Sequence, residues 1–359
     1  MSTRKATIGS LLSIAALLAA CSAGGSATPA ASTGGGGDGD GGETPESLTV
    51  LCTPQEDWCQ AMVQAFQTET GIETTYVRLS SGEAFARLQA AADAPEFSVW
   101  WGGPADGFVA ANAEGLIEPY VSPNAEAVSA DQKDADGVWT GVYVGALGFC
   151  SNTAVLDELG VDVPTSWDDL LDPALAGQVA IAHPASSGTA YTALYTQVLR
   201  LGGEDEAIEY MTELHPNILQ YTSSGAAPAE MAGRGEIAVS VVFSHDCVRN
   251  IDAGFTDLEV SFPEEGTGYE IGGVALIANA PEPEAAKMWI DWSLTAEAQE
   301  IGATTASFQL PTNPDAAVSE RSVNLDDVNL VDYDFQAAGE ARADLTARFE
   351  DEVAAKPAE

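Results

Sequence analysis

The 359-residue chain is poor in positive charge. It has 13 Lys and Arg residues against 55 Asp and Glu residues, a formal net charge of −42 at pH 7. Proteins that bind nucleic acid neutralise its phosphates with clustered cations, so this balance excludes a nucleic-acid partner. A surface this acidic instead favours solubility and repels other copies of itself.

The sequence also lacks the common catalytic motifs. The three histidines, His183, His215 and His245, do not form a His-Glu-x-x-His zinc motif. There is no Gly-x-Ser-x-Gly turn of a serine hydrolase and no complete phosphate-binding loop of a nucleotidase. We therefore expect no enzymatic activity, no cofactor and no metal site.

Long apolar runs are missing after the N-terminus. Two early cations, an apolar run over residues 8–18 and small residues before Cys21 predict a lipoprotein signal peptide over residues 1–20. The segment Leu-Leu-Ala-Ala-Cys at 17–21 resembles a bacterial lipobox, which implies lipidation of Cys21; an ordinary cleaved signal is the alternative. No later segment is long enough to span a bilayer. We expect a lipid anchor on the outer face of the cell membrane, extracellular or periplasmic.

Residues 21–46 are dominated by Gly, Ser, Ala and Thr. Such a composition buries too little apolar surface to offset the entropy of ordering, so we expect a lipidated flexible linker.

Four of the five cysteines follow this linker. Their spacing, one close pair and one distant pair, favours the disulfides Cys52–Cys59 and Cys150–Cys247 among three possible pairings. A zinc site at Cys52 and Cys59 is the alternative, but a second ligand pair is missing nearby.

The body of the chain alternates strand and helix patterns. The β-prone run 47–52 precedes a helix in which Trp58, Met62 and Phe66 recur every four residues, and Gly71 ends it. Repetition of this order predicts α/β structure with a mostly parallel sheet and helices on its faces. Ligands of such sheets bind at the carboxyl ends of the strands, here the loops after Leu51, Leu79 and Trp101.

About 310 residues are more than one hydrophobic core usually serves, which predicts two lobes. We expect the following division: lobe 1 over 47–143, lobe 2 over 144–250, a return to lobe 1 over 251–310, and a C-terminal helical segment over 311–359 packed on lobe 2.

Several segments together resemble the extracellular solute-binding proteins of ATP-binding-cassette importers. They are Gly-Leu-Ile-Glu-Pro-Tyr at 115–120, Pro-Thr-Ser-Trp-Asp-Asp-Leu at 164–170, Ser-Ser-Gly-Thr at 186–189, Gly-Glu-Ile-Ala-Val at 235–239 and Pro-Glu-Ala-Ala-Lys-Met-Trp-Ile-Asp-Trp at 283–292. The resemblance is to the ferric-ion-binding group. It implies a two-lobe periplasmic-binding-protein fold of type II, with hinge-linked mixed sheets and helices on both faces. It also implies a monomer that delivers a small solute to an ABC permease in the membrane.

Iron binders of this group carry two adjacent tyrosines after the strand that follows a Gly-Glu. Here Ser244, His245 and Asp246 stand at that place, so the phenolate clamp for a trivalent cation is missing. The pattern resembles instead the branch that binds hexose phosphates, to which proteins assigned to aminoalkylphosphonates are similar. We expect a small phosphorylated or phosphonylated solute; the alternatives are ferric iron, an unphosphorylated sugar and a polyamine.

Three loops are candidates for binding the anionic group. Backbone N–H groups and hydroxyls where a strand ends and a helix begins form an anion site, and Arg78 adds a charged contact. Gly188 permits close backbone approach. Simple helix capping is the alternative for each loop. The candidates are Arg78, Ser80, Ser81, Ser187, Gly188, Thr189 and Ser224.

Carboxylates and aromatic residues are candidates for the rest of the ligand. His245, Asp246 and Glu265, or Glu264 beside it, would accept hydrogen bonds from hydroxyl groups. The segment Trp-Trp-Gly-Gly at 100–103 contributes Trp101 and Gly103, and Trp100 and Tyr269 are further aromatic candidates. Buried aromatic residues more often belong to a core.

Overall fold

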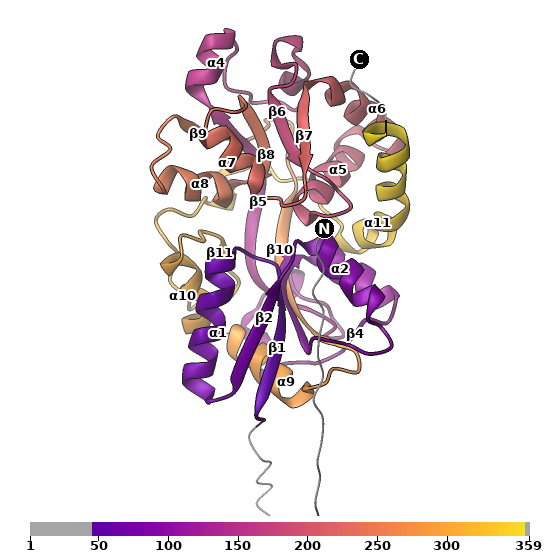
Figure 1. The fold of residues 1–359 in the computed structure, drawn as a ribbon, viewed down its shortest axis with the longest axis vertical. Coiled ribbons are helices and arrows are strands. Elements are labelled where there is room, and N and C mark those ends of the chain that lie inside the picture. The colour runs from indigo at the N-terminus through magenta and orange to yellow at the C-terminus, as the bar shows by residue number, and fades with distance from the viewer. Residues whose placement is uncertain (1–44, 356–359) are drawn as a thin grey trace, which may run out of the picture. The chain divides into compact units, whose positions relative to one another are not determined.

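The computed structural model describes residues 45–355 (Figure 1). The expected signal peptide, Cys21 and the linker up to residue 44 lie outside these residues. The structure is mixed α/β with helices on both faces of its sheet, as the alternating pattern predicts. None of the helices in residues 45–355 has the length and apolar character needed to cross a membrane.

Lobe 1 is built from the first strands and from chain that returns later. Its elements are β1 (Ser47–Cys52), α1 (Glu56–Thr70), β2 (Glu73–Arg78), α2 (Ser81–Ala90), β3 (Val99–Pro104), α3 (Ala105–Ala113), β4 (Ile117–Glu118), β10 (Tyr269–Ile277), α9 (Pro283–Ser293), α10 (Ala296–Thr304) and β11 (Leu310–Pro311). Strands β2, β1 and β3 are parallel, and β10 runs antiparallel to β3.

Lobe 2 has the same layered construction. Its elements are α4 (Thr153–Leu159), β6 (Val179–Ala182), α5 (Gly188–Leu201), α6 (Glu204–Leu214), β7 (Ile218–Thr222), α7 (Ala227–Gly233), β8 (Val239–Phe243), α8 (Ser244–Asp252) and β9 (Leu258–Ser261). Short 3-10 helices lie at Pro123–Ala127, Ala130–Gln132, Asp168–Leu171, Pro173–Leu175, His215–Asn217 and Leu325–Asp327.

One long strand joins the lobes. All of β5 (Thr140–Asn152) is buried; its first half pairs with β10 in lobe 1, and its second half pairs with β8 and β9 in lobe 2. The pairing of β9 with β5 keeps the chain in lobe 2 up to Ser261. The return to lobe 1 therefore follows Ser261, whereas the sequence placed it at residue 251.

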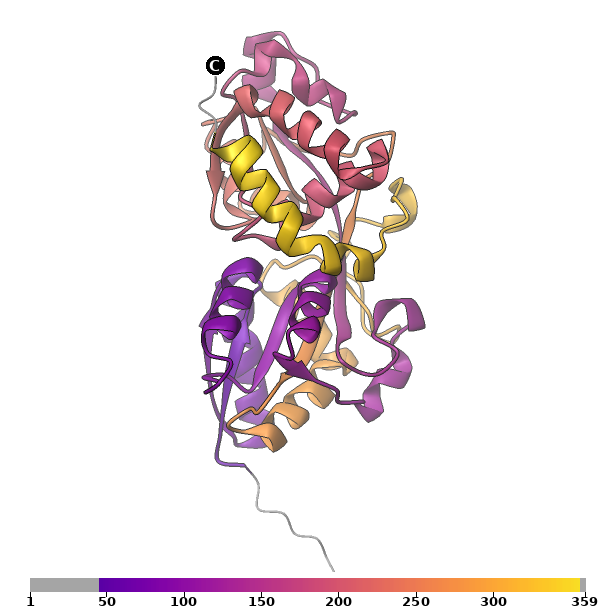
Figure 2. The same cartoon turned by 90° about the vertical axis from the view of Figure 1, so that its right-hand side faces the viewer.

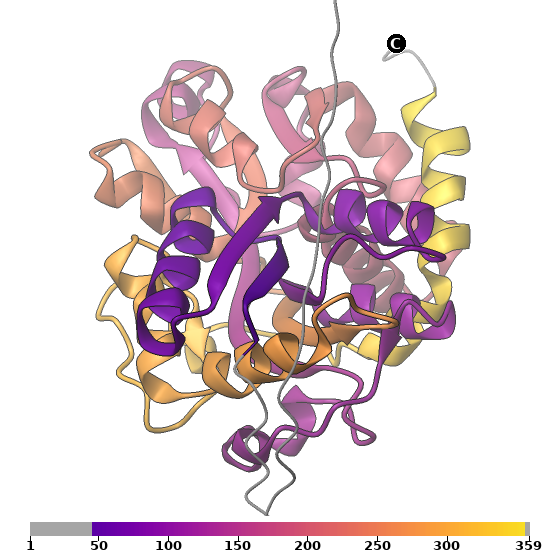
Figure 3. The ribbon, with the colours of Figure 1, turned by 60° about the horizontal axis from the view of Figure 1, so that its bottom comes forward.

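Apolar periodicity explains how the helices cover the sheet. Trp58, Met62 and Phe66 of α1 pack with Trp289 of α9 on one face of the lobe 1 strands, while α2 and α3 cover the opposite face. Figure 3 shows these strands with α1 to their left and α2 to their right. Gly71 ends α1 in the left-handed conformation (φ 76°), as predicted from its place in the sequence.

The C-terminal helix α11 (Phe335–Phe349), with the π turn Glu350–Ala354, contacts both lobes. Its Leu345 and Phe349 belong to the lobe 2 core, whereas Arg342 forms a buried ion pair of 3.3 Å with Asp106 of α3 in lobe 1. Figure 2 shows α11 in yellow along lobe 2, with its first turn beside lobe 1. The expected contact with lobe 2 is present, and a second contact with lobe 1 accompanies it.

Candidate functional site

Six helices in residues 45–355 begin at one cavity. The N-cap residues of α1, α2, α3, α5, α7 and α8 all line it, and they are Gln55, Ser80, Pro104, Ser187, Ala226 and Phe243. The cavity has a volume of about 60 Å³ and lies between the lobes. The carboxyl ends of β1, β2 and β3 lead to it, as expected for a parallel sheet.

Most of the candidate residues line this cavity. They are Arg78, Ser80, Ser81, Gly103, Ser187, Gly188, Thr189, His245 and Asp246. Residues that lie far apart in the sequence are thus brought together by two lobes facing each other.

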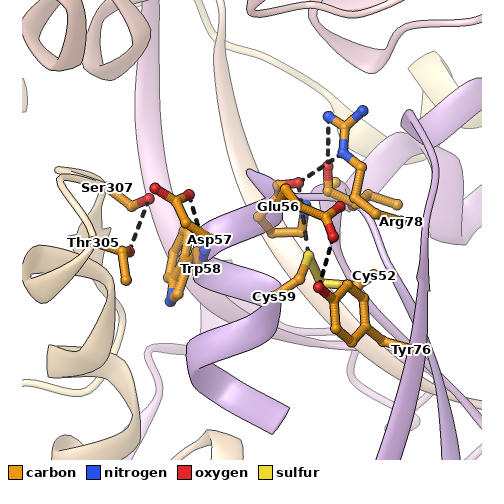
Figure 4. The surroundings of a disulfide bond; sticks show 12 residues. Cys52, Glu56, Asp57, Trp58, Cys59, Tyr76, Arg78, Thr305 and Ser307 are labelled. Carbon is orange, nitrogen blue, oxygen red and sulfur yellow. Dashed lines mark hydrogen bonds between the residues drawn. A yellow bond between two sulfur atoms is a disulfide. The ribbon is translucent and has the colours of Figure 1, made fainter. Parts of the chain in front are cut away.

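Arg78 differs from the other arginines of the described chain, because each of those pairs with a carboxylate. Its Nε donates to the carbonyl oxygen of Pro54 at 3.0 Å, and its Nη2 lies 3.5 Å from the carbonyl oxygen of Thr53 (Figure 4). These contacts position the guanidinium beside the cavity without an ion pair, and its charge acts at longer range on Asp246, whose pKa burial raises and Arg78 lowers.

The N-termini of α2 and α5 face each other across the cavity. Glu83 completes a capping box by accepting from the backbone N–H and the hydroxyl of Ser80, at 3.1 and 2.9 Å. At α5, the hydroxyl of Ser187 accepts from Ala190 N. Ser80 and Ser187 therefore cap their helices and also line the cavity.

Direct contacts join the lobes around the cavity. Gly82 N donates to Ser186 O at 2.9 Å, and Ser80 Oγ, whose single proton Glu83 and Ser223 O share, lies 3.0 Å from Ser223 O. A Cβ on Gly82 would lie 2.1 Å from Ala185 O, and one on Gly188 would lie 2.6 Å from the Pro104 ring. The lobes are thus closed on each other, and glycine is needed on both sides of the contact.

A second group of residues forms a carboxylate-rich wall. Asp246 and Glu270 are almost fully buried, and each has an oxygen 3.8 Å from His245 Nε2. Burial raises the pKa of Asp246 to about 7 and raises the pKa of Glu270 well above its usual value. Burial lowers the pKa of His245 to about 3, so the imidazole is neutral at pH 7. This wall offers acceptors for hydroxyl or ammonium groups.

Two disulfides hold the loops that form the site, and both pairings predicted from the sequence are confirmed. Cys52–Cys59 closes the segment that carries Thr53, Pro54 and Gln55 (Figure 4), and Cys150–Cys247 ties β5 to the first turn of α8. The alternative zinc site at Cys52 and Cys59 is therefore wrong.

Three candidates do not line the cavity. Trp101 is 1% exposed and packs edge-on against Trp58 in the lobe 1 core, because β3 turns it toward α1. Ser224 lies beside the lining residue Gly225 without joining the wall. Glu265 accepts hydrogen bonds from Ser166 Oγ and Trp167 N and so orders a surface turn.

The further candidates from the sequence, Trp100, Tyr269 and Glu264, do not line the cavity either. Trp100 stacks on Phe108 at 4.2 Å, Tyr269 packs edge-on against Phe335, and Glu264 is exposed. These are core or surface positions.

The sequence interpretation missed Gln55, Tyr143, Glu270 and Gln309, which line the cavity. One of them carried a signal. Glu270 follows Tyr269 in an otherwise apolar strand, and a lone carboxylate in a buried strand is rarely there for packing. Tyr143 lies in an all-buried strand in the same way, and its hydroxyl accepts from Gly103 N at 2.9 Å.

No group of three or more His, Cys, Asp and Glu side chains in residues 45–355 is arranged to hold a metal ion. The cavity instead combines uncharged donors, one arginine and buried carboxylates. This set suits a small polar solute that carries a negative group at one end.

Comparisons with known proteins agree with this geometry. A Haemophilus influenzae protein is 39% identical over 314 residues, covering 85% of this chain and 90% of the relative. A Salmonella typhimurium protein, whose name assigns it to binding 2-aminoethylphosphonate in the periplasm, is 25% identical over 288 residues, covering 77% and 80%.

A solved structure is also similar. The periplasmic binding protein AfuA of Actinobacillus pleuropneumoniae, described with bound fructose-6-phosphate, superposes with a TM-score of 0.83 at 38% identity, covering 86% of this chain and 99% of that one. The two-lobe type II periplasmic-binding-protein fold inferred from the resemblance is thereby confirmed.

The family model for bacterial extracellular solute-binding proteins matches residues 61–327. Its members are non-enzymatic components of import systems, which confirms the expectation that the chain is no enzyme. The chain belongs to the bacterial extracellular solute-binding protein family and is the solute-binding component of an ABC importer.

Proposed function

We propose that this protein captures a small phosphorylated or phosphonylated solute between its lobes and delivers it to a membrane permease. The observation that carries the proposal is the convergence on one cavity of six helix N-termini and of Arg78, the one arginine of residues 45–355 that forms no ion pair. Helix N-termini present free N–H groups and a partial positive charge, which favour an anion. AfuA, with fructose-6-phosphate bound, and the Salmonella protein named for 2-aminoethylphosphonate give the same ligand class.

The anionic group belongs at the end of the cavity formed by Arg78, Ser81 and the α5 N-terminus. Donors there come from both lobes, so a tetrahedral group with several acceptor oxygens satisfies more of them than a carboxylate would. Binding at this place therefore stabilises the closed state.

The remainder of the ligand belongs at the wall of Asp246 and Glu270. Both carboxyl groups accept hydrogen bonds, and a protonated one also donates. Hydroxyl groups of a sugar or the ammonium group of an aminoalkylphosphonate match this wall. The neutral His245 adds one donor and one acceptor.

Thermal unfolding of the chain without its signal and lipidation site, residues 22–359, tests the ligand class. The panel is fructose 6-phosphate, 2-aminoethylphosphonate, inorganic phosphate, free fructose, a polyamine and ferric citrate. A ligand at a hundred times its Kd stabilises by about 2.7 kcal/mol, a shift of a few degrees in a protein of this size. We expect shifts with phosphorylated or phosphonylated compounds alone.

Arg78→Ala combined with Ser81→Ala should abolish the shift. The matched control is Arg87→Ala, because Arg87 lies on the same helix as Ser81 and pairs with Glu96 on the surface. A shift produced by ferric citrate or free fructose instead would overturn the proposed ligand class while leaving the family unaffected.

We also propose that the signal and Cys21 anchor the protein to the outer face of the membrane as a monomeric lipoprotein. The Leu-Leu-Ala-Ala-Cys segment supports this. Cys21→Ala should release the protein from the membrane fraction, and retention of the variant there would contradict the proposal.

A further inference from the structure

A second cavity adjoins the first behind Gln55 and Asp246. Its volume is about 250 Å³, and Gln55, Ala226 and Asp246 belong to the walls of both cavities. The rest of its wall comes from α7, α8 and the turn after α8. We call this second space the side chamber.

One hydrogen bond forms the partition between the two spaces. Gln55 Nε2 donates to Asp246 Oδ1 at 2.7 Å. Gln55 is the N-cap residue of α1 in lobe 1, and Asp246 lies in the first turn of α8 in lobe 2. The partition therefore exists only when the lobes are closed, which is the state in which ligand length matters.

The side chamber is lined partly by polar side chains and opens to solvent. Glu230 and Arg234 lie 3.4 Å apart on its wall, and Arg249 and Asn250 complete the polar part of the lining. Arg234 pairs with Glu230, Arg249 pairs with Asp57, and Asn250 donates to Asp246 O. A hydroxylated substituent such as a sugar ring can add hydrogen bonds to the remaining donors and acceptors of these groups.

We propose that Gln55 is a specificity-determining residue that sets the maximum length of the ligand. The inference rests on the proposed function. The main cavity is small, at about 60 Å³, and the Gln55–Asp246 hydrogen bond closes it on the side of the chamber. A ligand whose anionic end lies at Arg78 meets the partition at its other end. Removal of the Gln55 side chain joins the side chamber to the cavity and admits a longer ligand.

The test compares a short and a long ligand in the same variants. Calorimetry gives the Kd values of glycerol 3-phosphate and trehalose 6-phosphate, a disaccharide phosphate, for the wild-type mature chain, Gln55→Gly and Gln55→Ala. We expect the wild type to prefer the short ligand by about 100-fold or more, and Gln55→Gly to narrow that ratio by at least about tenfold.

Asp57→Ala is the matched control. Asp57 is two residues from Gln55 and also joins the lobes, through an ion pair of 2.6 Å with Arg249, but it lines neither cavity. This variant should weaken both ligands alike and leave the ratio unchanged.

Two results would overturn the inference: an unchanged ratio in Gln55→Gly with both ligands weakened equally, or an equal change of ratio in Asp57→Ala. Either would mean that Gln55 only supports closure. Failure of the proposed function looks different, because then the wild type binds no phosphorylated compound of any length.

Discussion

Replacement of Gly82 by alanine should separate ligand binding from folding. Gly82 is the second residue of α2, and its N–H donates to Ser186 O across the cleft. An added Cβ would lie 2.1 Å from Ala185 O and 2.7 Å from the Ser186 carbonyl carbon. Real Cβ atoms essentially never come within 3.0 Å of another heavy atom, so the lobes must separate by about 1 Å here, enough to loosen a binding site.

The structure gives the expected size of the effect. A shift of that size lengthens the hydrogen bonds that Ser187, Gly188 and Thr189 would make to an anion bound against lobe 1. Loss of two such bonds to a charged group costs about 3–6 kcal/mol, which corresponds to a Kd increase of roughly 10²–10⁴-fold. Folding should not suffer, because alanine is preferred to glycine inside a helix by up to about 1 kcal/mol.

Calorimetric titration with the tightest ligand measures the loss of affinity, and thermal unfolding without ligand measures folding. Gly107→Ala is the control, since its Cβ would meet only the Trp100 ring, at an ordinary 3.4 Å within lobe 1. If Gly82→Ala bound the ligand with the same Kd as the wild type, the reasoning would be refuted, because the observed closure would then not be required for binding.

Three further predictions concern stability. Burial raises the pKa of Asp246 from 3.8 to about 7, so the folded state holds this proton more tightly than the unfolded state. Asp246 alone therefore contributes up to about 4 kcal/mol of stability at pH 4 that is lost as pH rises to 8, while the lowered pKa of His245 acts in the opposite direction; the difference in melting temperature between the wild type and Asp246→Asn, followed against pH, should show the Asp246 contribution. Replacing Cys150 and Cys247 by alanine opens a link across 97 residues and should cost about 4–5 kcal/mol in urea unfolding; a cost below about 1 kcal/mol would contradict this. Arg342→Met leaves the buried Asp106 without its ion pair and should cost about 3–5 kcal/mol by the same assay, whereas an unchanged midpoint would mean that the pair adds nothing.

Local patterns in the sequence singled out many of the residues that line the cavity of the proposed site. Ser80 and Ser187 follow strands and begin helices, which places free N–H groups at the carboxyl edge of a parallel sheet whatever the rest of the chain does. Cysteine spacing likewise favoured, among three possible pairings, the two disulfides that the structure contains.

Residues whose place depends on how distant segments pack together could not be predicted from such local patterns. The sequence favoured Glu265 as the carboxylate of the crossing segment, but the structure brings Glu270 to the cavity, because Glu270 lies in β10, which runs beside β5 at the hinge, whereas Glu265 lies in the preceding loop. With 55 acidic residues in the chain, the presence of a carboxylate in a loop carries little information. The place of Trp101 could not be predicted from the sequence either. Whether its side chain points to the cavity or to the core depends on which face of β3 the helix α1 covers.

The acidity of the chain explains why the proposed anion site depends on backbone groups. Among so many carboxylates an exposed arginine finds a partner, as the other arginines of residues 45–355 do, and then offers little to a ligand. The partial positive charge of a helix N-terminus is not lost to a surface carboxylate unless that side chain accepts hydrogen bonds from the same N–H groups. Arg78 forms no ion pair, because its guanidinium donates instead to the backbone oxygens of Thr53 and Pro54, which carry no net charge. If the proposed anion binds, a protein of net charge −42 would attract it only at short range, where converging backbone dipoles outweigh a surface field that falls off within about 8 Å at physiological salt.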